Sequence, residues 1–352
     1  MHLLVTGGNG FVGRHVVTVA TRRGHTVRVL ARSQTTRVPA SWEDQPNIEV
    51  LHADLKDANA AAACAHGADA VVHLAVAKKE TSGDPVEATL KATENLLNAM
   101  VSMETQRIIL VSSLSVYEYL DRQSWDTLAE TSPLSRHPEE RDIYCQTKLA
   151  QEQRVREHAA ENGWRCVVLR PGVIFGRDNL WNGRVGMQVK PRWWVRTGTF
   201  APLPLTYVEN CAEAIVKAAE YEGEQRELVL NVVDDETPSQ RAYLNELRRH
   251  MPERPRIIPI PWTVMRALAR TASVVNGVFF RGTAKVPGLF VPARLHARCK
   301  PMRYPNTRIK EALGWQPRYT WREGVARALS ESNRGESLSC CTPTGEQSHE
   351  EA

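Results

Sequence analysis

Tyr144 and Lys148 stand four residues apart in the polar stretch RDIYCQTK, residues 141–148. In a helix, side chains at positions i and i+4 share one face, so the phenol and the ammonium would lie together. A nearby ammonium lowers the pKa of a tyrosine, which can then exchange a proton with a substrate oxygen. The same spacing also arises by chance on a solvated helix. The pair therefore indicates catalysis only if neighbouring elements bring a cofactor and an oxygen-binding group beside it.

A glycine-rich turn near the N-terminus would supply the cofactor site. In TGGNGFVG, residues 6–13, the glycines Gly7, Gly10 and Gly13 stand three apart between an apolar run and a segment with helical periodicity. A tight strand-to-helix turn, the close approach of a pyrophosphate and close helix packing each require a residue without a Cβ. An ordinary glycine turn is the alternative. The position between strand and helix favours a dinucleotide whose phosphates lie at the helix N-terminus.

The end of the second predicted strand indicates which dinucleotide is bound. An NAD site usually places an acid there for the ribose 2′-hydroxyl, whereas TVRVLARS ends in Arg32 and Ser33 and the next acid is Glu43. An arginine suits the 2′-phosphate of NADP, so NADP(H) is favoured and NAD(H) stays open. A solvated arginine at a strand end is the other interpretation. Asp54, after the third strand, is placed to bind an adenine amino group.

Strand and helix patterns alternate along the first 175 residues. Apolar runs separated by helical segments are typical of a parallel sheet covered on both faces. The sequence therefore predicts an α/β fold with a doubly wound parallel sheet of the Rossmann type over 1–175. Residues 176–330 are expected to form a smaller, interleaved substrate-binding part, with segments near 203–235 returning to the first domain. The polar stretch 333–352 is predicted to be a disordered tail.

Composition narrows the function classes. The net charge of +5 is spread over 352 residues, which argues against nucleic acid as a partner. Seven scattered cysteines without zinc spacing predict no metal site and reduced thiols, and no leader-like or membrane-spanning segment is evident. We therefore expect a cytoplasmic protein with a small-molecule substrate. A homodimer is possible.

These motifs resemble those of the extended short-chain dehydrogenase/reductases, in the broad NAD-dependent epimerase/dehydratase group. The resemblance covers roughly residues 1–330. It is carried by TGGNGFVG (6–13), ADL (53–55), HLAVA (73–77), LVSSLSVY (110–117), YCQTK (144–148), LRPGVIFG (169–176), LPLTYVENCAEAI (203–215), NVVDDE (231–236) and LGWQP (313–317).

The resemblance implies roles for particular residues. Ser113, Tyr144 and Lys148 correspond to the catalytic serine, tyrosine and lysine, with Ser112 and Ser115 close enough in sequence to share that geometry. His73 would pack or touch the cofactor. Thr89 stands where many relatives have asparagine. The implied cofactor contacts are Gly7, Asn9, Gly10, Phe11, Val12, Gly13, Arg32, Asp54, Leu55, Leu74, Ala75, Val76, Ser112, Tyr144, Lys148, Pro171, Gly172 and Val173.

Departures from the family pattern bear on the reaction. Leu114 and Ser115 replace the Asp-Glu pair of the dehydratases, and Gly172 stands near the place where nucleotide-sugar enzymes usually have asparagine. LRPGVIFG and PLTYVEN look more like the carbonyl-reductase and hydroxysteroid-dehydrogenase branches. We therefore expect an NADP(H)-dependent oxidoreductase acting on a ketone or alcohol. An NAD-dependent nucleotide-sugar epimerase and a non-catalytic cofactor-sensing protein are the alternatives.

Two segments after residue 176 carry aromatic and basic residues. Trp181, Arg192 and Trp193 could stack on a flat substrate and pair with its carboxylate or phosphate, with Ser115 a further substrate contact. Equally, the tryptophans could be core or dimer contacts and the cations a solvated face. The apolar and basic stretch 261–290 could be a lid or could lie against a membrane surface. The resemblance favours the lid, because this part of the chain closes the pocket in the family.

Overall fold

The computed structural model of the chain describes residues 1–32, 38–42, 45–77, 83–177, 179–181, 184–190, 192–197, 200–250, 255–281 and 288–332. The predicted disordered tail, 333–352, lies outside the described residues, as does Ser33.

A seven-stranded sheet with every pair of neighbours parallel forms the larger part of the molecule. Its strands are rich in Val, Ile and Leu and largely buried, as expected when helices cover both faces. The predicted doubly wound parallel sheet is confirmed. In spatial order the strands are β11 (Glu227–Val232), β6 (Arg165–Pro171), β5 (Arg107–Val111), β4 (Ala70–His73), β1 (His2–Thr6), β2 (Thr26–Ala31) and β3 (Ile48–His52).

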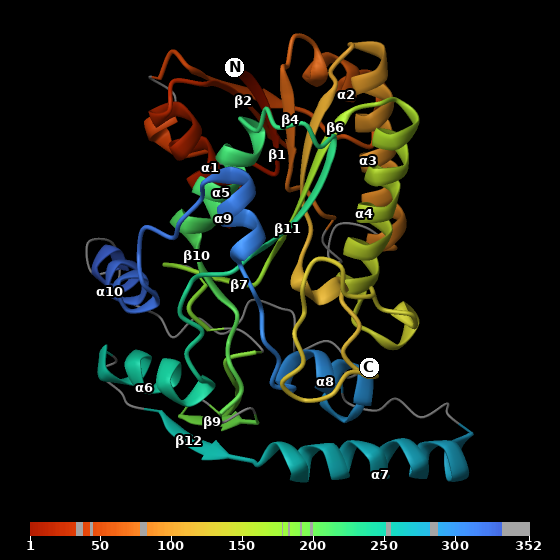
Figure 1. Cartoon of the computed structure of the whole chain (residues 1–352), viewed down its shortest axis with the longest axis vertical. Coiled ribbons are helices and arrows are strands. Elements are labelled where there is room, and N and C mark those ends of the chain that lie inside the picture. Colours follow the sequence, from red (N-terminus) through yellow and green to blue (C-terminus); the bar gives the residue numbers. More distant parts are fainter. Residues whose placement is uncertain are drawn as a thin grey trace.

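Helices pack on the two faces of this sheet (Figure 1). On one face α1 (Phe11–Arg22) and α5 (Val208–Ala219) bury Val16, Ile215 and their neighbours against the strands. On the other face lie α2 (Ala58–Ala65), α3 (Pro85–Ser102) and α4 (Ile143–Glu161). Aspartates begin these three helices, because each carboxylate accepts hydrogen bonds from N–H groups of the first turn.

The strand order changes direction at β1, where a ligand crevice is expected. From β1 the chain builds β2 and β3 on one side, then crosses to β4, β5 and β6 on the other. The loops after β1 and β4 therefore diverge at the carboxyl ends of these strands. Ligands of open α/β sheets bind in such a crevice.

A smaller region below the sheet contains the remaining elements (Figure 1). β7 (Val173–Phe175) pairs with β10 (Leu205–Tyr207), and β9 lies between β8 and β12 in a three-stranded sheet. The order within this region is β8 (Met187–Lys190), β9 (Trp193–Arg196), α6 (Gln240–His250), β12 (Arg256–Pro259), α7 (Trp262–Phe280), α8 (Pro292–Cys299) and α10 (Trp321–Ser332). Helix α9 (Thr307–Leu313) instead packs beside α5 on the parallel sheet (Figure 1).

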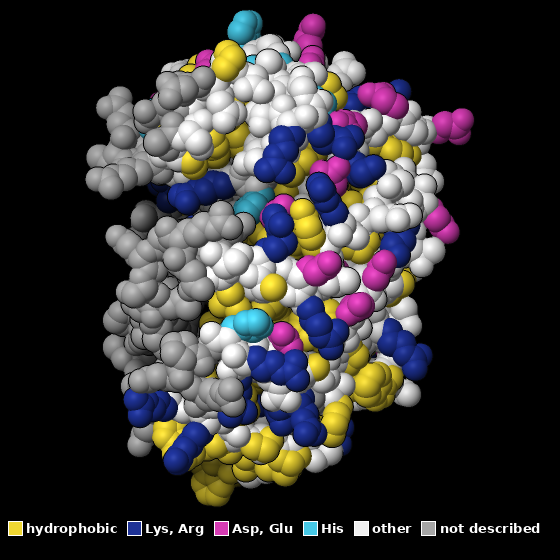
Figure 2. Space-filling view, turned by 90° about the vertical axis from the view of Figure 1, so that its left-hand side faces the viewer, with side chains coloured by type: hydrophobic (Ala, Val, Ile, Leu, Met, Phe, Trp, Pro, Cys, Tyr) yellow, Lys and Arg dark blue, Asp and Glu magenta, His cyan; other side chains and the backbone are white. Residues whose placement is uncertain are grey.

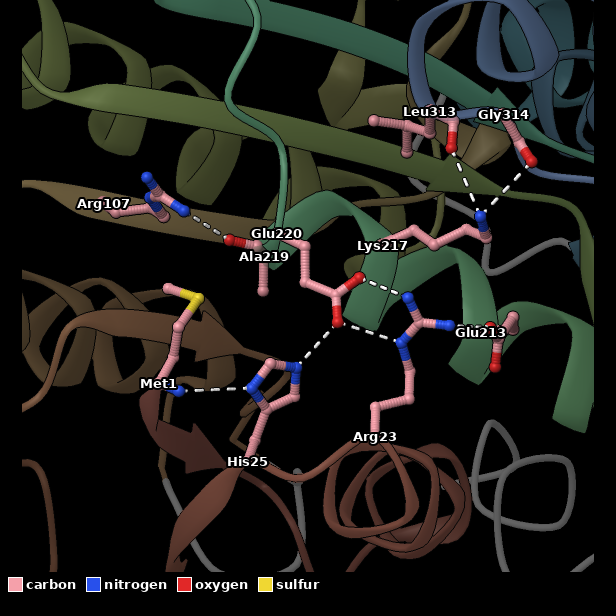
Figure 3. A network of polar contacts seen from close by, with 10 residues as sticks. All are labelled: Met1, Arg23, His25, Arg107, Glu213, Lys217, Ala219, Glu220, Leu313 and Gly314. Atoms are coloured by element: carbon pink, nitrogen blue, oxygen red, sulfur yellow. Dashed lines mark hydrogen bonds and ion pairs between the residues drawn. The ribbon is translucent and has the colours of Figure 1, made fainter.

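Polar contacts tie the start of the chain to α5 (Figure 3). Arg23 pairs with Glu213 at 2.8 Å and with Glu220 at 2.6 Å, and Glu220 also contacts His25 Nε2 at 2.7 Å. These groups are partly exposed, so the network orients α5 beside α1 more than it stabilises the fold.

The described cysteines are all buried and free of disulfides: Cys64, Cys145, Cys166, Cys211 and Cys299. Burial raises the pKa of Cys145 and of Cys166 to about 12, which leaves these thiols protonated and unreactive. Within the described residues, no group of three or more His, Cys, Asp or Glu side chains could hold a metal ion. No helix of the described residues is long and apolar enough to cross a membrane.

Candidate active site

The glycine turn between β1 and α1 has no room for side chains at two of its glycines. Gly7 adopts φ +69°, and a Cβ there would lie 3.0 Å from Ala75 N. A Cβ on Gly13 would lie 2.3 Å from Gly7 O and 2.6 Å from Gly8 Cα. The turn is therefore packed tightly against the segment after β4 and against the start of α1. This cradle fits a dinucleotide pyrophosphate at the N-terminus of α1.

Other residues expected to contact the cofactor follow the carboxyl ends of β2, β3 and β4. Arg32 is exposed directly after β2, and Asp54 Oδ1 accepts a hydrogen bond from Lys56 N at 3.0 Å. Leu55 is buried, and its carbonyl accepts from Asn95 Nδ2 at 2.8 Å. After β4, Leu74 N donates to Thr6 O, which holds the segment that continues to Ala75 and Val76 against the end of β1.

At the turn itself, Asn9 accepts from Arg14 Nε through both its backbone and side-chain oxygens, at 3.0 and 3.2 Å. Phe11 begins α1 and packs edge-on against His15 at 6.2 Å between ring centroids. Val12 packs against the core on the α1 face of the sheet.

Tyr144 and Lys148 lie in the first turns of α4, as the spacing predicts. The Tyr144 side chain is 50% exposed, whereas Lys148 is 3% exposed. Lys148 Nζ reaches the end of β5 and donates to Val111 O at 2.8 Å and to Gln151 Oε1 at 3.0 Å. Burial lowers the pKa of Lys148 to about 7, only partly opposed by the charge of Glu152.

The three serines after β5 differ in their surroundings. Ser113 caps a 3-10 helix (Leu114–Val116), and its Oγ accepts from Ser115 N at 3.1 Å. Ser112 is buried and donates to Glu152 Oε2 at 2.6 Å, so its hydroxyl points into the protein. Ser115 Oγ is buried and has no hydrogen-bond partner among the described residues. Of the three hydroxyls, that of Ser113 accepts from the backbone of its own turn.

Gln151 links Lys148 to His73. Its Oε1 accepts from the ammonium, so its amide nitrogen faces His73 Nε2 at 2.9 Å and must donate. His73 Nε2 is then the acceptor, and Nδ1–H donates to Thr6 Oγ1 at 2.7 Å. Burial and the positive charge of Lys148 lower the pKa of His73 to about 3, so the ring is neutral. A chain of hydrogen bonds therefore connects Gln151 on α4 with His73 on β4 and Thr6 on β1.

A buried ion pair lies beneath the serines. Glu152 and Arg170 are 1% and 2% exposed, and the guanidinium contacts both carboxylate oxygens. The same guanidinium lies 4.8 Å from the centre of the Tyr117 ring, whose hydroxyl donates to Asn231 Oδ1 at 2.7 Å. These polar groups fix α4 against β6, and so fix the position of Lys148.

Thr89 connects the start of α3 to the segment after β4. Its Oγ1 donates to Pro85 O at 2.7 Å and accepts from Ala77 N at 3.0 Å. The side chain therefore holds the segment after β4 on the first turn of α3.

The turn Pro171–Gly172–Val173 joins β6 to β7 at the crevice. A Cβ on Gly172 would lie 2.0 Å from Pro204 O, which accepts from Val173 N at 2.6 Å. No residue larger than glycine fits this position without moving the backbone.

A cationic pocket begins on the other side of Pro204. It lies next to Tyr119, whose ring has the Arg184 guanidinium 5.6 Å from its centre and whose hydroxyl donates to Leu114 O at 3.0 Å. The pocket therefore shares Pro204 with the neighbourhood of Gly172, and its Arg184 contacts Tyr119. Sequence patterns did not indicate it, because its walls come from separate segments. They are Arg184, Ala201, Pro202, Leu203, Pro204, Gln240, Arg298, Cys299, Lys300 and Tyr304.

The three aromatic and basic residues expected to bind substrate lie in the smaller region. Trp181 packs on buried Trp194 at 4.3 Å between ring centroids, and Arg256 lies 5.2 Å from the Trp193 ring centre. Arg192 is exposed, and its carbonyl accepts from Arg256 N at 2.8 Å. These recorded contacts join β9 to its neighbours, and none of them reaches Ser113.

Comparison with protein families gives one model that covers most of the chain. A model described as "NAD dependent epimerase/dehydratase family" matches residues 3–232. That range begins at β1 and ends at β11, so it contains the whole parallel sheet and every residue of the expected catalytic set.

Curated relatives match at lower coverage. A 3β-hydroxysteroid dehydrogenase/Δ5→4-isomerase of Mycobacterium tuberculosis is 29% identical over 256 residues, which cover 69% of this chain and 64% of the relative. The chain thus spans less than two thirds of that relative's length. Cinnamoyl-CoA reductase 1 of Arabidopsis thaliana is 27% identical, with coverage of 49% of this chain and 52% of the relative.

Solved structures share the fold. A UDP-glucose 4-epimerase from Bifidobacterium longum, in complex with NAD+ and UDP, superposes with a TM-score of 0.70. It is 18% identical, and the match covers 95% of this chain and 99% of that one. At this identity the similarity establishes the shared architecture alone.

Proposed function

The chain belongs to the NAD dependent epimerase/dehydratase family, and from that premise we propose that it is an NADP(H)-dependent oxidoreductase. It would transfer a hydride between the nicotinamide and a ketone or alcohol. The observation that carries the proposal is the buried Lys148 ammonium, held at the end of β5 beneath the exposed Tyr144 on the same helix. A protein that only sensed the cofactor would not need such a pair beside the serine turn after β5.

Each member of the proposed set has a distinct task. The bound nicotinamide supplies the hydride in reduction. Tyr144 would donate the proton that the carbonyl oxygen gains, so that the ketone, the hydride on carbon and this proton on oxygen together make the alcohol. Ser113 holds that oxygen through its hydroxyl, and Lys148 keeps positive charge beside the tyrosine. The Gly7–Gly13 turn binds the phosphates, and Arg32 faces the adenosine ribose.

Two features support net reduction over epimerisation. Arg32 follows β2 where an NAD site usually has an acid, and NADP is the cofactor that cells hold largely reduced. Gly172 stands near the asparagine of nucleotide-sugar enzymes, and its backbone neighbour Pro204 O leaves no room for a side chain there. The nucleotide-sugar epimerase remains the second candidate, because the fold is shared with such enzymes.

The pocket beside Tyr119 supports a choice of substrate class. Arg184, Arg298 and Lys300 line it together with Tyr304. These cations would attract an acidic group, and we propose that the part of the substrate distant from the carbonyl is flat or acidic.

The deciding experiment measures cofactor binding and turnover together. We expect the native protein to bind NADPH more tightly than NADH, and Arg32→Asp to reverse the order. Arg22→Asp, an equal charge change at the exposed end of α1, is the matched control and should leave the order unchanged.

With a panel of ketones and aldehydes, NADPH should be consumed in step with alcohol formation. Protein that purifies with tightly held NAD⁺ and interconverts UDP-hexoses without net cofactor consumption would assign the epimerase reaction instead. Tighter NADH binding by the native protein would also overturn the cofactor assignment.

A further inference from the structure

Helix α7 (Trp262–Phe280) exposes large apolar side chains along most of its length. Met265 and Ala269 are buried against Leu295 and Cys299, which attaches one face of the helix to α8. The exposed large apolar residues are Val264 at 46%, Leu268 at 47%, Val274 at 64%, Val275 at 40%, Val278 at 68% and Phe279 at 75%.

These residues form a continuous stripe. At about 100° per residue, Val264, Leu268, Val275 and Phe279 fall on one side of the helix, with Val274 and Val278 beside them. The buried Met265 and Ala269 point about 100° away. The exposed Arg266 and Arg270 point to the remaining side. The helix therefore has a face for the protein, an apolar face toward solvent, and a basic edge next to it.

The charged residues in the surrounding sequence are all Lys or Arg. Residues 254–310 contain twelve Lys or Arg and no Asp or Glu. The whole chain carries +5, so the remaining residues together carry −7. In Figure 1, α7 runs along the lower edge, at the end of the molecule opposite the N-terminus. Figure 2 shows hydrophobic and Lys or Arg side chains gathered together at that lower end.

We propose that α7 lies in the plane of a membrane surface that contains anionic phospholipid. The apolar stripe would enter the boundary between headgroups and acyl chains, and the arginines at its edge would meet the phosphates. The helix lies on the bilayer and does not cross it, in agreement with the absence of a helix in the described residues that could span one. The parallel sheet would face away from the membrane.

A second copy of the chain is the competing occupant of this stripe. Two copies packed through α7 would bring two segments of charge +12 together with no acidic residue in either to offset them. An anionic bilayer supplies the opposite charge at high density. Charge complementarity therefore favours the lipid surface.

The test is co-sedimentation of the purified full chain with vesicles. Phosphatidylcholine vesicles that contain phosphatidylserine should bind the protein, vesicles of phosphatidylcholine alone should bind it at least about tenfold less, and added salt should weaken binding. Leu268→Glu and Phe279→Glu should each reduce binding by about tenfold or more. Val101→Glu in α3 is the matched control, because Val101 is 47% exposed as Leu268 is.

Circular dichroism and melting temperature would show that each variant is folded. Absence of binding to the anionic vesicles, or binding that Leu268→Glu and Phe279→Glu leave unchanged, would overturn the proposal. Size-exclusion chromatography with light scattering provides the second measurement. A dimer that Phe279→Glu dissociates, with no vesicle binding by the native protein, would assign the stripe to self-association.

Discussion

Tyr144 and Lys148 differ in exposure, which suggests different roles in the proposed pair. The phenol is half-exposed at the crevice, where a substrate oxygen can reach it, and the ammonium is enclosed below. Tyr144→Phe removes the proton donor and retains the ring. We expect turnover to fall by about 100-fold or more, with little change in the Kd for NADPH. Steady-state kinetics and fluorescence titration would measure both quantities.

Tyr221→Phe, far along the sequence at the end of α5, should leave turnover unchanged and serves as the control for losing a phenol oxygen. Near-native turnover of the Tyr144→Phe enzyme would show that another group donates the proton.

The pKa of Lys148 predicts a pH dependence. Burial lowers it from 10.5 to about 7, so the folded protein releases this proton at lower pH than the unfolded chain. Between about pH 7 and pH 10 the unfolded chain holds more protons, and this group's contribution makes stability rise with pH. Turnover should instead decrease as the pH rises, because Tyr144 loses the positive charge of Lys148 beside it. We expect kcat/KM for reduction to fall above about pH 7, and a profile that stays flat to pH 9 would contradict this.

At the scale of elements, the β1–α1 turn depends on close backbone packing. A Cβ at Gly13 would overlap Gly7 O and Gly8 Cα, which are backbone atoms that cannot rotate away. Gly13→Ala should therefore push α1 from β1, lower the melting temperature by several degrees and weaken NADPH binding. Calorimetry and titration would measure these changes.

Gly277→Ala is the control for this glycine substitution. No atom lies within 4 Å of a Cβ at Gly277, and alanine favours the helix by up to about 1 kcal/mol, so this variant should not be destabilised. Equal effects of the two substitutions would show that packing at Gly13 is not the cause.

Local patterns predicted the parallel sheet and the glycine turn, because each depends on residues that are neighbours in the chain. The support beneath Lys148 was missed for the opposite reason. Gln151 and Glu152 look like ordinary helix-surface residues, and their partners His73 and Arg170 come from other strands. The three-stranded sheet of β8, β9 and β12 was also missed. The pairing of β8 with β9 has an irregular register between Gln188 and Lys190, which disturbs the alternation of apolar and polar residues expected in a strand.

At the scale of the whole molecule, Asn210 joins the end of the described chain to the parallel sheet. Its Nδ2 donates to Asp234 Oδ1 and Tyr319 O, and its Oδ1 accepts from Arg318 N and Tyr319 N. Asn210→Ala would leave several of these groups without partners. We expect the free energy of unfolding to decrease by about 2–4 kcal/mol.

Urea unfolding would measure that loss, and limited proteolysis should cut the α9–α10 segment faster in the variant. Asn162→Ala is the control, because its amide makes one recorded hydrogen bond, to His158 O at the exposed end of α4. A loss no larger than that of the control would show that other contacts hold the C-terminal helices.

The buried cysteines allow opening of the molecule to be followed position by position. A thiol reacts with an alkylating reagent as the thiolate, and burial both blocks access and raises the pKa of these groups. Cys64, Cys166 and Cys211 lie in elements that build the two faces of the sheet, whereas Cys299 lies in α8. Peptide mass spectrometry after timed alkylation would therefore distinguish two modes of opening. Labels appearing together would mean cooperative unfolding, and an early label on Cys299 would mean that α8 separates while the sheet stays closed.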